Sequence, residues 1–305
     1  MTIQFDGKVA IVTGAGNGLG KSHALAFASR GAKVVVNDLG GARDGTGQSS
    51  EAAQAVVAEI KKNGGDAIAN GANVANFEEV QGMVQQAMDA WGRVDILVNN
   101  AGILRDKSFS KMTMEDFKLV VDVHLMGAAY CSKAVWEIMK EQAYGRIVMV
   151  SSASGLYGNF GQSNYSAAKL GVVGLMNTLA QEGEKYNIRV NSLAPAALTR
   201  MTEDIMDPRA SEVLKPEPVS AGVLALCAED APNKFILCAG AGGFSWSHSY
   251  ETNGVYLSQN EQTPEGVVAR WSEIVDTKGE ESLDSALNQT AKFIKAALAE
   301  LKEKG

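Results

Sequence analysis

The chain has 305 residues, of which 46% are hydrophobic and 21% charged, as in an ordinary soluble globular protein with a full buried core. The net charge of −7 and the pI near 5.2 argue against a nucleic-acid surface, which needs a basic stripe. No segment reaches the roughly 18 uncharged apolar residues of a membrane span. We therefore expect neither a nucleic-acid partner nor a membrane.

The cysteines and histidines are few and scattered. The chain has three cysteines without C-x-x-C spacing, namely Cys131, Cys227 and Cys238. This pattern is typical of reduced thiols in a cytoplasmic protein. The N-terminus carries an acidic residue and no apolar run, so we expect no signal peptide. The three histidines form no ligand spacing, and we predict no metal site.

A glycine-rich turn follows the first predicted strand, residues 8–13 (KVAIVT), whose β-branched run is typical of a buried parallel strand. The glycines that fit the pattern G-x-x-x-G-x-G are Gly14, Gly18 and Gly20. Glycines let the backbone approach a pyrophosphate at the N-terminus of the next helix, predicted from Leu19 to Arg30. We expect this loop, including Asn17 and Leu19, to bind a dinucleotide. A glycine-rich turn without a ligand is the alternative.

An acidic residue ends the second predicted strand, Lys33 to Asn37. Asp38 lies at about the 20-residue offset at which a carboxylate binds an adenosine ribose. Such a carboxylate accepts hydrogen bonds from the ribose hydroxyls and repels a 2′-phosphate, so NAD is predicted over NADP. Arg43 in the following loop weakens this preference. A role for Asp38 as a helix cap or turn residue is the alternative.

Strand and helix patterns then alternate. Further helices are predicted at about 50–62, 77–91 and 113–141, and further strands at 66–70, 94–98, 145–150, 188–195 and around 235–238. This alternation predicts an α/β fold with a single Rossmann-like, doubly wound parallel sheet of about seven strands and helices on both faces. We expect this domain at 1–245. A helical C-terminal extension, with Thr263 and Ser282 as helix caps, would occupy 246–305 and pack on the same domain or on a dimer partner.

Three polar side chains lie within the segment SSASGLYGNFGQSNYSAAK. They are the hydroxyl of Ser152, the phenol of Tyr165 and the ammonium of Lys169. If Tyr165 lies on a helix, the i,i+4 spacing puts phenol and ammonium on one face. A neighbouring positive charge lowers the pKa of a tyrosine from about 10, so Tyr165 is predicted to take a proton from an alcohol. A surface Tyr and Lys pair is the alternative for an isolated Y-x-x-x-K.

These residues and TGAGNGLG together resemble the short-chain dehydrogenase/reductase family. The resemblance implies that Ser152 hydrogen-bonds the substrate oxygen and that Tyr165 transfers the proton. It also implies that Lys169 tunes Tyr165 and holds the nicotinamide ribose, with Tyr165 beside it. VVVNDLGG, YGRIVMVSSASGLYGNFGQSNYSAAKLG, APAALTRM and LKPEPV are most similar to the (3R)-hydroxyacyl-CoA dehydrogenase units of peroxisomal-type multifunctional enzymes.

The resemblance also implies further site residues. Additional cofactor contacts are expected at Asn73, Val74, Asn100, Ala101, Gly102, Pro195 and Thr199. His124 stands where the family usually has an asparagine that organises a water leading to Lys169, and it is included among the catalytic candidates because imidazole can serve the same relay. A buried histidine satisfied by the backbone is the alternative.

The resemblance implies an activity and its alternatives. It predicts NAD-dependent oxidation of a (3R)-3-hydroxyacyl-CoA by a stand-alone dehydrogenase that self-associates as a dimer or tetramer. A hydroxysteroid dehydrogenase or a 3-oxoacyl thioester reductase would use the same chemistry on another substrate. A non-catalytic nucleotide-binding regulator is the alternative from another class, against which the intact Ser/Tyr/Lys set argues.

Overall fold

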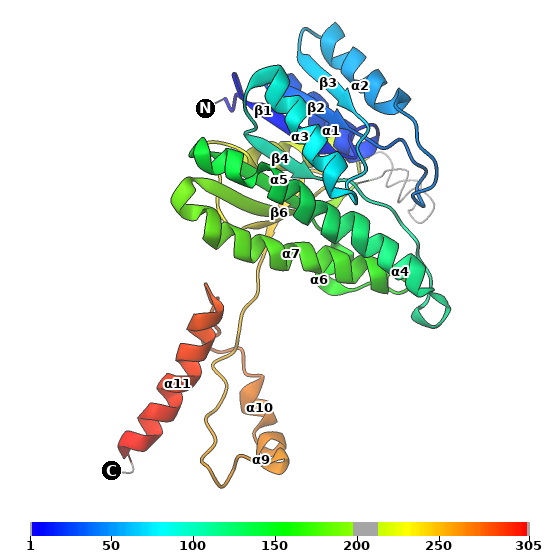
Figure 1. Cartoon of the computed structure of the whole chain (residues 1–305). Coiled ribbons are helices and arrows are strands. Elements are labelled where there is room, and N and C mark those ends of the chain that lie inside the picture. The colour runs from blue at the N-terminus through cyan, green and yellow to red at the C-terminus, as the bar shows by residue number, and fades with distance from the viewer. Residues whose placement is uncertain (1, 198–212, 304–305) are drawn as a thin grey trace. The chain divides into compact units, whose positions relative to one another are not determined.

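An eight-stranded sheet organises the first part of the computed structural model, which describes residues 2–197 and 213–303 (Figure 1). The strands are β1 (Val9–Thr13), β2 (Lys33–Asn37), β3 (Asp66–Asn70), β4 (Ile96–Asn99), β5 (Gly145–Val150), β6 (Ile188–Ala196), β7 (Ile236–Gly240) and β8 (Gly243–Ser247). Their order is β3-β2-β1-β4-β5-β6-β7-β8, and the pairs from β3 to β7 are parallel. This is the predicted doubly wound arrangement.

The eighth strand was not predicted. Ala241 and Gly242 both have positive φ, 51° and 78°, which is the backbone of a tight two-residue hairpin turn. The chain therefore reverses after β7 and adds β8 at the edge, which makes the sheet mixed. The sequence does not signal this hairpin turn, because alanine is an unusual residue at a position with positive φ.

Helices cover both faces of the sheet. The longer ones are α1 (Gly18–Ala28), α2 (Glu51–Lys62), α3 (Phe77–Trp91), α5 (Gly127–Glu141), α7 (Ser163–Gly183) and α8 (Pro216–Leu226), and the shorter ones are η1 (Phe109–Lys111), α4 (Met114–Val121), the π-helical η2 (Asp122–Met126), α6 (Ala153–Tyr157) and η3 (Glu184–Tyr186). Buried residues of α1, α2 and α8 share one core cluster. Those of α3, α5 and α7 share another. The sheet thus lies between two helical layers.

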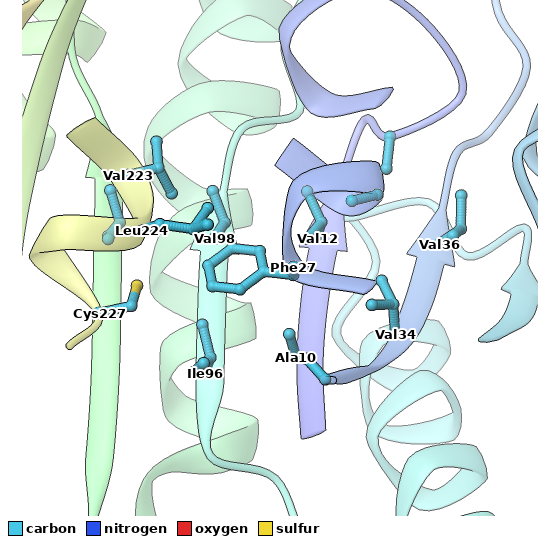
Figure 2. Close-up of a cluster of buried hydrophobic side chains, with 14 of the residues drawn as sticks. Ala10, Val12, Phe27, Val34, Val36, Ile96, Val98, Val223, Leu224 and Cys227 are labelled. Atoms are coloured by element: carbon cyan, nitrogen blue, oxygen red, sulfur yellow. The ribbon is translucent and has the colours of Figure 1, made fainter. Parts of the chain in front are cut away.

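Each parallel strand contributes to both core clusters. In β1, Ala10 and Val12 lie in the cluster of α1 and α8, whereas Val9 and Ile11 lie in the other. Figure 2 shows the first cluster, in which the ring of Phe27 from α1 lies among side chains of β1, β2, β4 and α8. Burial on both faces explains why these strands read as continuous apolar runs instead of alternating patterns.

Several predicted bounds are confirmed, among them those of β2, β3, α3 and β5. The strand predicted at 94–98 lies at 96–99 instead. The single helix predicted over 113–141 is wrong, since a π-helical turn at Asp122–Met126 separates α4 from α5. Hydrophobic periodicity does not reveal this turn, because the i→i+5 hydrogen bonds involve only five residues within a longer apolar helical pattern.

The C-terminal residues form a compact unit of their own, Ser247–Gly305, distinct from Met1–Trp246. Its helices are α9 (Pro264–Ala269), α10 (Trp271–Ile274) and α11 (Ala286–Glu303). Thr263 caps α9 as predicted, accepting from the Gly266 N–H at 3.1 Å. Ser282 does not cap α11, which begins four residues later. The packing of this unit on the sheet domain or on a partner chain stays a prediction.

The assignment of Phe27 to the core predicts a stability effect. Phe27→Ala should lower the free energy of unfolding by about 3–5 kcal/mol, because the ring is 0% exposed and its removal leaves a cavity. Phe109→Ala removes the same atoms from a ring that is 73% exposed and should change the free energy by about 0.5 kcal/mol at most. Urea unfolding followed by circular dichroism measures both; equal losses would contradict this core.

Candidate active site

A cleft of about 250 Å³ lies at the carboxyl ends of β1, β2 and β4. The chain order of the strands reverses here, since β1 lies between β2 and β4, and such a switch point is where ligands bind in open α/β sheets. The predicted cofactor residues that line the cleft are Gly14, Asn17, Gly18, Leu19, Gly20, Asp38, Asn73, Val74, Asn100, Ala101 and Gly102. The structure thus brings together residues from four separate motifs.

The glycine-rich turn fits close against the segment after β4. Gly14 has φ 62°, and a Cβ there would lie 2.8 Å from the Cα of Ala101. The Asn100 side chain donates to the carbonyls of Thr13 at 2.9 Å and of Gly14 at 3.1 Å. α1 begins at Gly18, so its free amides open on the cleft. This arrangement suits the pyrophosphate of a dinucleotide.

The Asp38 carboxylate joins two loops at the cleft. One oxygen accepts from the Gly16 N–H and the other from the Gly40 N–H, each at 2.7 Å. A carboxylate has about four acceptor sites, so two remain for the hydroxyls of a ribose. Arg43 also lines the cleft. The Asp38 carboxylate and the glycine-rich turn therefore fit the ribose and the pyrophosphate of an adenine dinucleotide.

Ser152, Tyr165 and Lys169 converge beside this cleft. Ser152 is the N-cap of α6, and its hydroxyl accepts from the Ser154 N–H at 3.2 Å. Tyr165 and Lys169 lie one turn apart on α7, which confirms the predicted helix. The Lys169 Nζ is 5.6 Å from the centre of the Tyr165 ring, and the Ser152 side chain hydrogen-bonds the phenol. Hydroxyl, phenol and ammonium thus form one cluster.

Lys169 is buried between α7 and β5, with 4% of its surface exposed. Its Nζ donates to the Val150 carbonyl at 2.6 Å, and Ser151 Oγ donates to the Lys169 carbonyl at 2.7 Å. α6 approaches so closely that a Cβ at Gly155 would lie 2.7 Å from the Lys169 Cβ. Burial lowers the pKa of Lys169 to about 7. The Lys169 side chain can therefore exchange between ammonium and neutral amine near neutral pH.

The pKa of Tyr165 departs from the prediction. Burial raises it, the hydrogen bond from Ser152 lowers it, and the charge of Asp106 raises it, so the net direction is upward. The expectation that Lys169 holds this pKa low is wrong for the chain without a ligand, because the lysine is itself desolvated and bonded to Val150. Ser152 is the group that favours the phenolate here.

His124 lies in the π-helical turn against the ring of Tyr165. The two rings meet edge to face, with centroids 5.1 Å apart and planes at 87°. Its Nε2 is 2.8 Å from the Ile103 carbonyl. Burial first, and then the charge of Lys169, lower the pKa of His124 to about 3, so the imidazole is neutral. Its role in a proton relay stays a prediction.

Three of the predicted cofactor residues that the structure describes do not line this cleft, namely Tyr165, Lys169 and Pro195. Pro195 lies near the end of β6 and pairs with Ala239 of β7. Thr199 lies outside the described residues. Further lining residues after β2 and β4 were not predicted, chiefly Leu39, Gly41, Ala42, Gly45 and Ile103. The glycine-rich run directly after Asp38 is the signal that marks this wall.

A membrane-spanning helix and a metal site are both absent from the part of the chain that the structure describes. No helix there is long and apolar enough to cross a membrane. Nor do three or more His, Cys, Asp or Glu side chains gather there as a metal site would require.

Comparisons relate the chain to known proteins. Residues 8–210 match the family described as short chain dehydrogenase. Peroxisomal multifunctional enzyme type 2 of Mus musculus is 51% identical over 277 residues, which cover 90% of this chain and 37% of the mouse protein. The structure of full-length peroxisomal multifunctional enzyme type 2 from Drosophila melanogaster has a TM-score of 0.82 and 39% identity, covering 99% of this chain and 51% of that one.

A third relative was solved with ligands. The structure of 7α-hydroxysteroid dehydrogenase complexed with NADH and 7-oxo glycochenodeoxycholic acid has a TM-score of 0.71 and 32% identity, covering 79% of this chain and 95% of that one. The chain thus spans most of this enzyme, but about half or less of the two multifunctional relatives.

The buried lysine predicts a pH-dependent stability. The folded-state pKa of Lys169, about 7, lies below its ordinary value of 10.5, so folding releases a proton between these values and this group's contribution to stability rises with pH there. Lys169→Met removes the titration. The melting temperature of the variant minus that of the wild type should be largest near pH 7 and fall towards pH 10, as measured by thermal unfolding. A difference independent of pH would contradict the shift.

Proposed function

The chain belongs to the short-chain dehydrogenase family and is an oxidoreductase acting on CH–OH groups, and we propose that it oxidises (3R)-3-hydroxyacyl-CoA to 3-oxoacyl-CoA with NAD. The observation that carries the proposal is the cluster of Ser152, Tyr165 and Lys169 beside a cleft that is lined by the glycine-rich turn and Asp38. The likeness to the multifunctional enzymes supports an acyl-CoA substrate. The carboxylate of Asp38 supports NAD over NADP.

The proposed mechanism follows from the environment of each side chain. Ser152 donates a hydrogen bond to the substrate oxygen and holds it beside the phenol. Tyr165 as phenolate removes the hydroxyl proton. Lys169, whose pKa lies near 7, supplies positive charge to the phenolate while it is protonated. A bound NAD would supply the nicotinamide carbon that takes the hydride.

A second substrate class has a specific observation in its favour. The solved 7α-hydroxysteroid dehydrogenase shares the fold over 79% of this chain and holds a bile-acid product with NADH. A steroid alcohol would meet the same three side chains, because the scaffold fixes the chemistry and leaves the substrate to surrounding loops. Self-association and a cytoplasmic location also stay proposals, and the relatives that support the acyl-CoA substrate carry the word peroxisomal in their names.

The substrate can be tested by following the absorbance of the reduced cofactor. We expect NADH to form from the R enantiomer of a 3-hydroxyacyl-CoA, and little product from the S enantiomer or with NADP. A 7-hydroxy bile acid serves as the steroid control. Turnover of the bile acid without turnover of either thioester would replace the acyl-CoA by a steroid and keep the chemistry.

The role of Tyr165 can be tested separately from binding. Tyr165→Phe should reduce kcat at least about 100-fold, because the general acid–base group is lost, while the Kd for NADH changes little. Tyr157→Phe is the matched control, since that phenol lies in the same segment but is 74% exposed. Full turnover by Tyr165→Phe would remove this residue from the mechanism.

A further inference from the structure

The loop between β2 and α2, residues 38–50 and here called the β2–α2 loop, forms one wall of the cleft. Gly41, Ala42, Arg43 and Gly45 line it. The loop has no regular secondary structure and is closed on itself by backbone bonds, from Ala42 N–H to the Thr46 carbonyl at 2.7 Å and from Ser49 N–H to the Leu39 carbonyl at 3.0 Å. Its position at the cleft must therefore be fixed by contacts with residues outside the loop.

The segment after β4 holds this loop. The Leu104 N–H donates to the Arg43 carbonyl at 3.0 Å. Arg105 Nε donates to the Asp44 carbonyl at 2.9 Å. A Cβ at Gly45 would lie 3.2 Å from the side chain of Ile103, so the loop and the segment after β4 lie close together at this glycine. Arg105 contributes the polar side-chain contact to the loop, and its hydrogen bond goes to the backbone carbonyl of Asp44.

The Arg105 side chain is also held by Asp116 of α4, on the side away from the loop. Its Nη1 donates to one oxygen of Asp116 at 2.7 Å, and Lys107 Nζ is 3.2 Å from the other oxygen. The hydrogen bond from Arg105, and then that from Lys107, hold the pKa of Asp116 below its ordinary value, so this carboxylate is charged at neutral pH. The Arg105 carbonyl accepts from Asn164, the neighbour of Tyr165, at 3.1 Å.

We propose that Arg105 is a positioning residue that holds the β2–α2 loop as the wall of the adenosine side of the cleft and so sets the affinity for an adenine dinucleotide. The side chain acts through the backbone of Asp44. A guanidinium donates in two directions at once, here to α4 and to the loop, which an ammonium on a flexible stem does not reproduce. Without the Arg105 side chain, the loop would have to be ordered when the dinucleotide binds, and the cost of ordering it would lower the affinity for the dinucleotide.

This inference rests on the proposed function in one respect, that the cleft binds the dinucleotide. It places Arg105 on the Asp38 side of the cleft, so the effect should fall on the adenosine half of the ligand. Lys107 is the matched control. It shares the Asp116 carboxylate with Arg105, and the hydrogen bonds described for its side chain include none to the β2–α2 loop.

The test is calorimetric titration of the folded full chain with NADH, ADP-ribose and nicotinamide mononucleotide. Arg105→Ala should raise the Kd for NADH and for ADP-ribose about 10-fold, from loss of a charge-assisted hydrogen bond, and leave that for the mononucleotide unchanged. Arg105→Lys should show a similar loss while keeping the charge beside Asp116. Lys107→Ala should bind all three ligands as the wild type does.

Two further readouts separate positioning from general damage. In steady-state assays Arg105→Ala should raise KM for NAD with kcat unchanged. Limited trypsin digestion should cut after Arg43 faster in this variant, and ADP-ribose should slow the cut.

Three results would overturn the inference. They are unchanged ADP-ribose affinity in both Arg105 variants, an equal loss in Lys107→Ala, and an equal loss for the mononucleotide. A wild-type chain that binds neither NADH nor ADP-ribose would refute the proposed function as well, whereas wild-type binding combined with unaffected Arg105 variants refutes the positioning role alone.

Discussion

The burial of the Lys169 ammonium is the constraint on which the site depends. A charged group 4% exposed is costly unless it is bonded or neutral, and here the Val150 carbonyl binds it while desolvation lowers its pKa to about 7. The same residue is anchored through its own carbonyl by Ser151. These two bonds join α7 to the end of β5 in one register. Tyr165, one turn earlier, therefore has to lie beside Ser152, which follows the same strand.

Burial acts on the two titrating partners in opposite directions. It raises the pKa of Tyr165 and lowers that of Lys169, so both shifts favour the neutral pair in the chain alone. In the chain alone, the hydrogen bond from Ser152 is the contribution that favours the phenolate. The sequence spacing predicts which side chains meet. It does not predict the sign of the shift, because desolvation depends on packing by α6 and β5.

Features with local causes were predictable. The strands read as apolar runs, the glycine-rich turn follows β1, and Asp38 ends β2, so the sheet and most of the cleft follow from short segments. Features set by distant contacts were not. The π-helical turn depends on where His124 packs, the β8 hairpin has alanine at a position with positive φ, and the β2–α2 loop takes its place from Arg105, which lies 61 residues from its partner Asp44.

The segment after β4 connects the π-helical turn that carries His124 with the β2–α2 loop. The His124 Nε2 lies 2.8 Å from the Ile103 carbonyl and 3.1 Å from the Ile103 N–H, and its Nδ1 is buried with no hydrogen-bond partner among the described residues. A Cβ at Gly102 would overlap this imidazole, so glycine is required there by a side chain of the π-helical turn. Ile103 in turn packs on Gly45 of the β2–α2 loop. Because His124 also contacts the Tyr165 ring, the catalytic phenol and the cofactor wall are positioned by the same few residues.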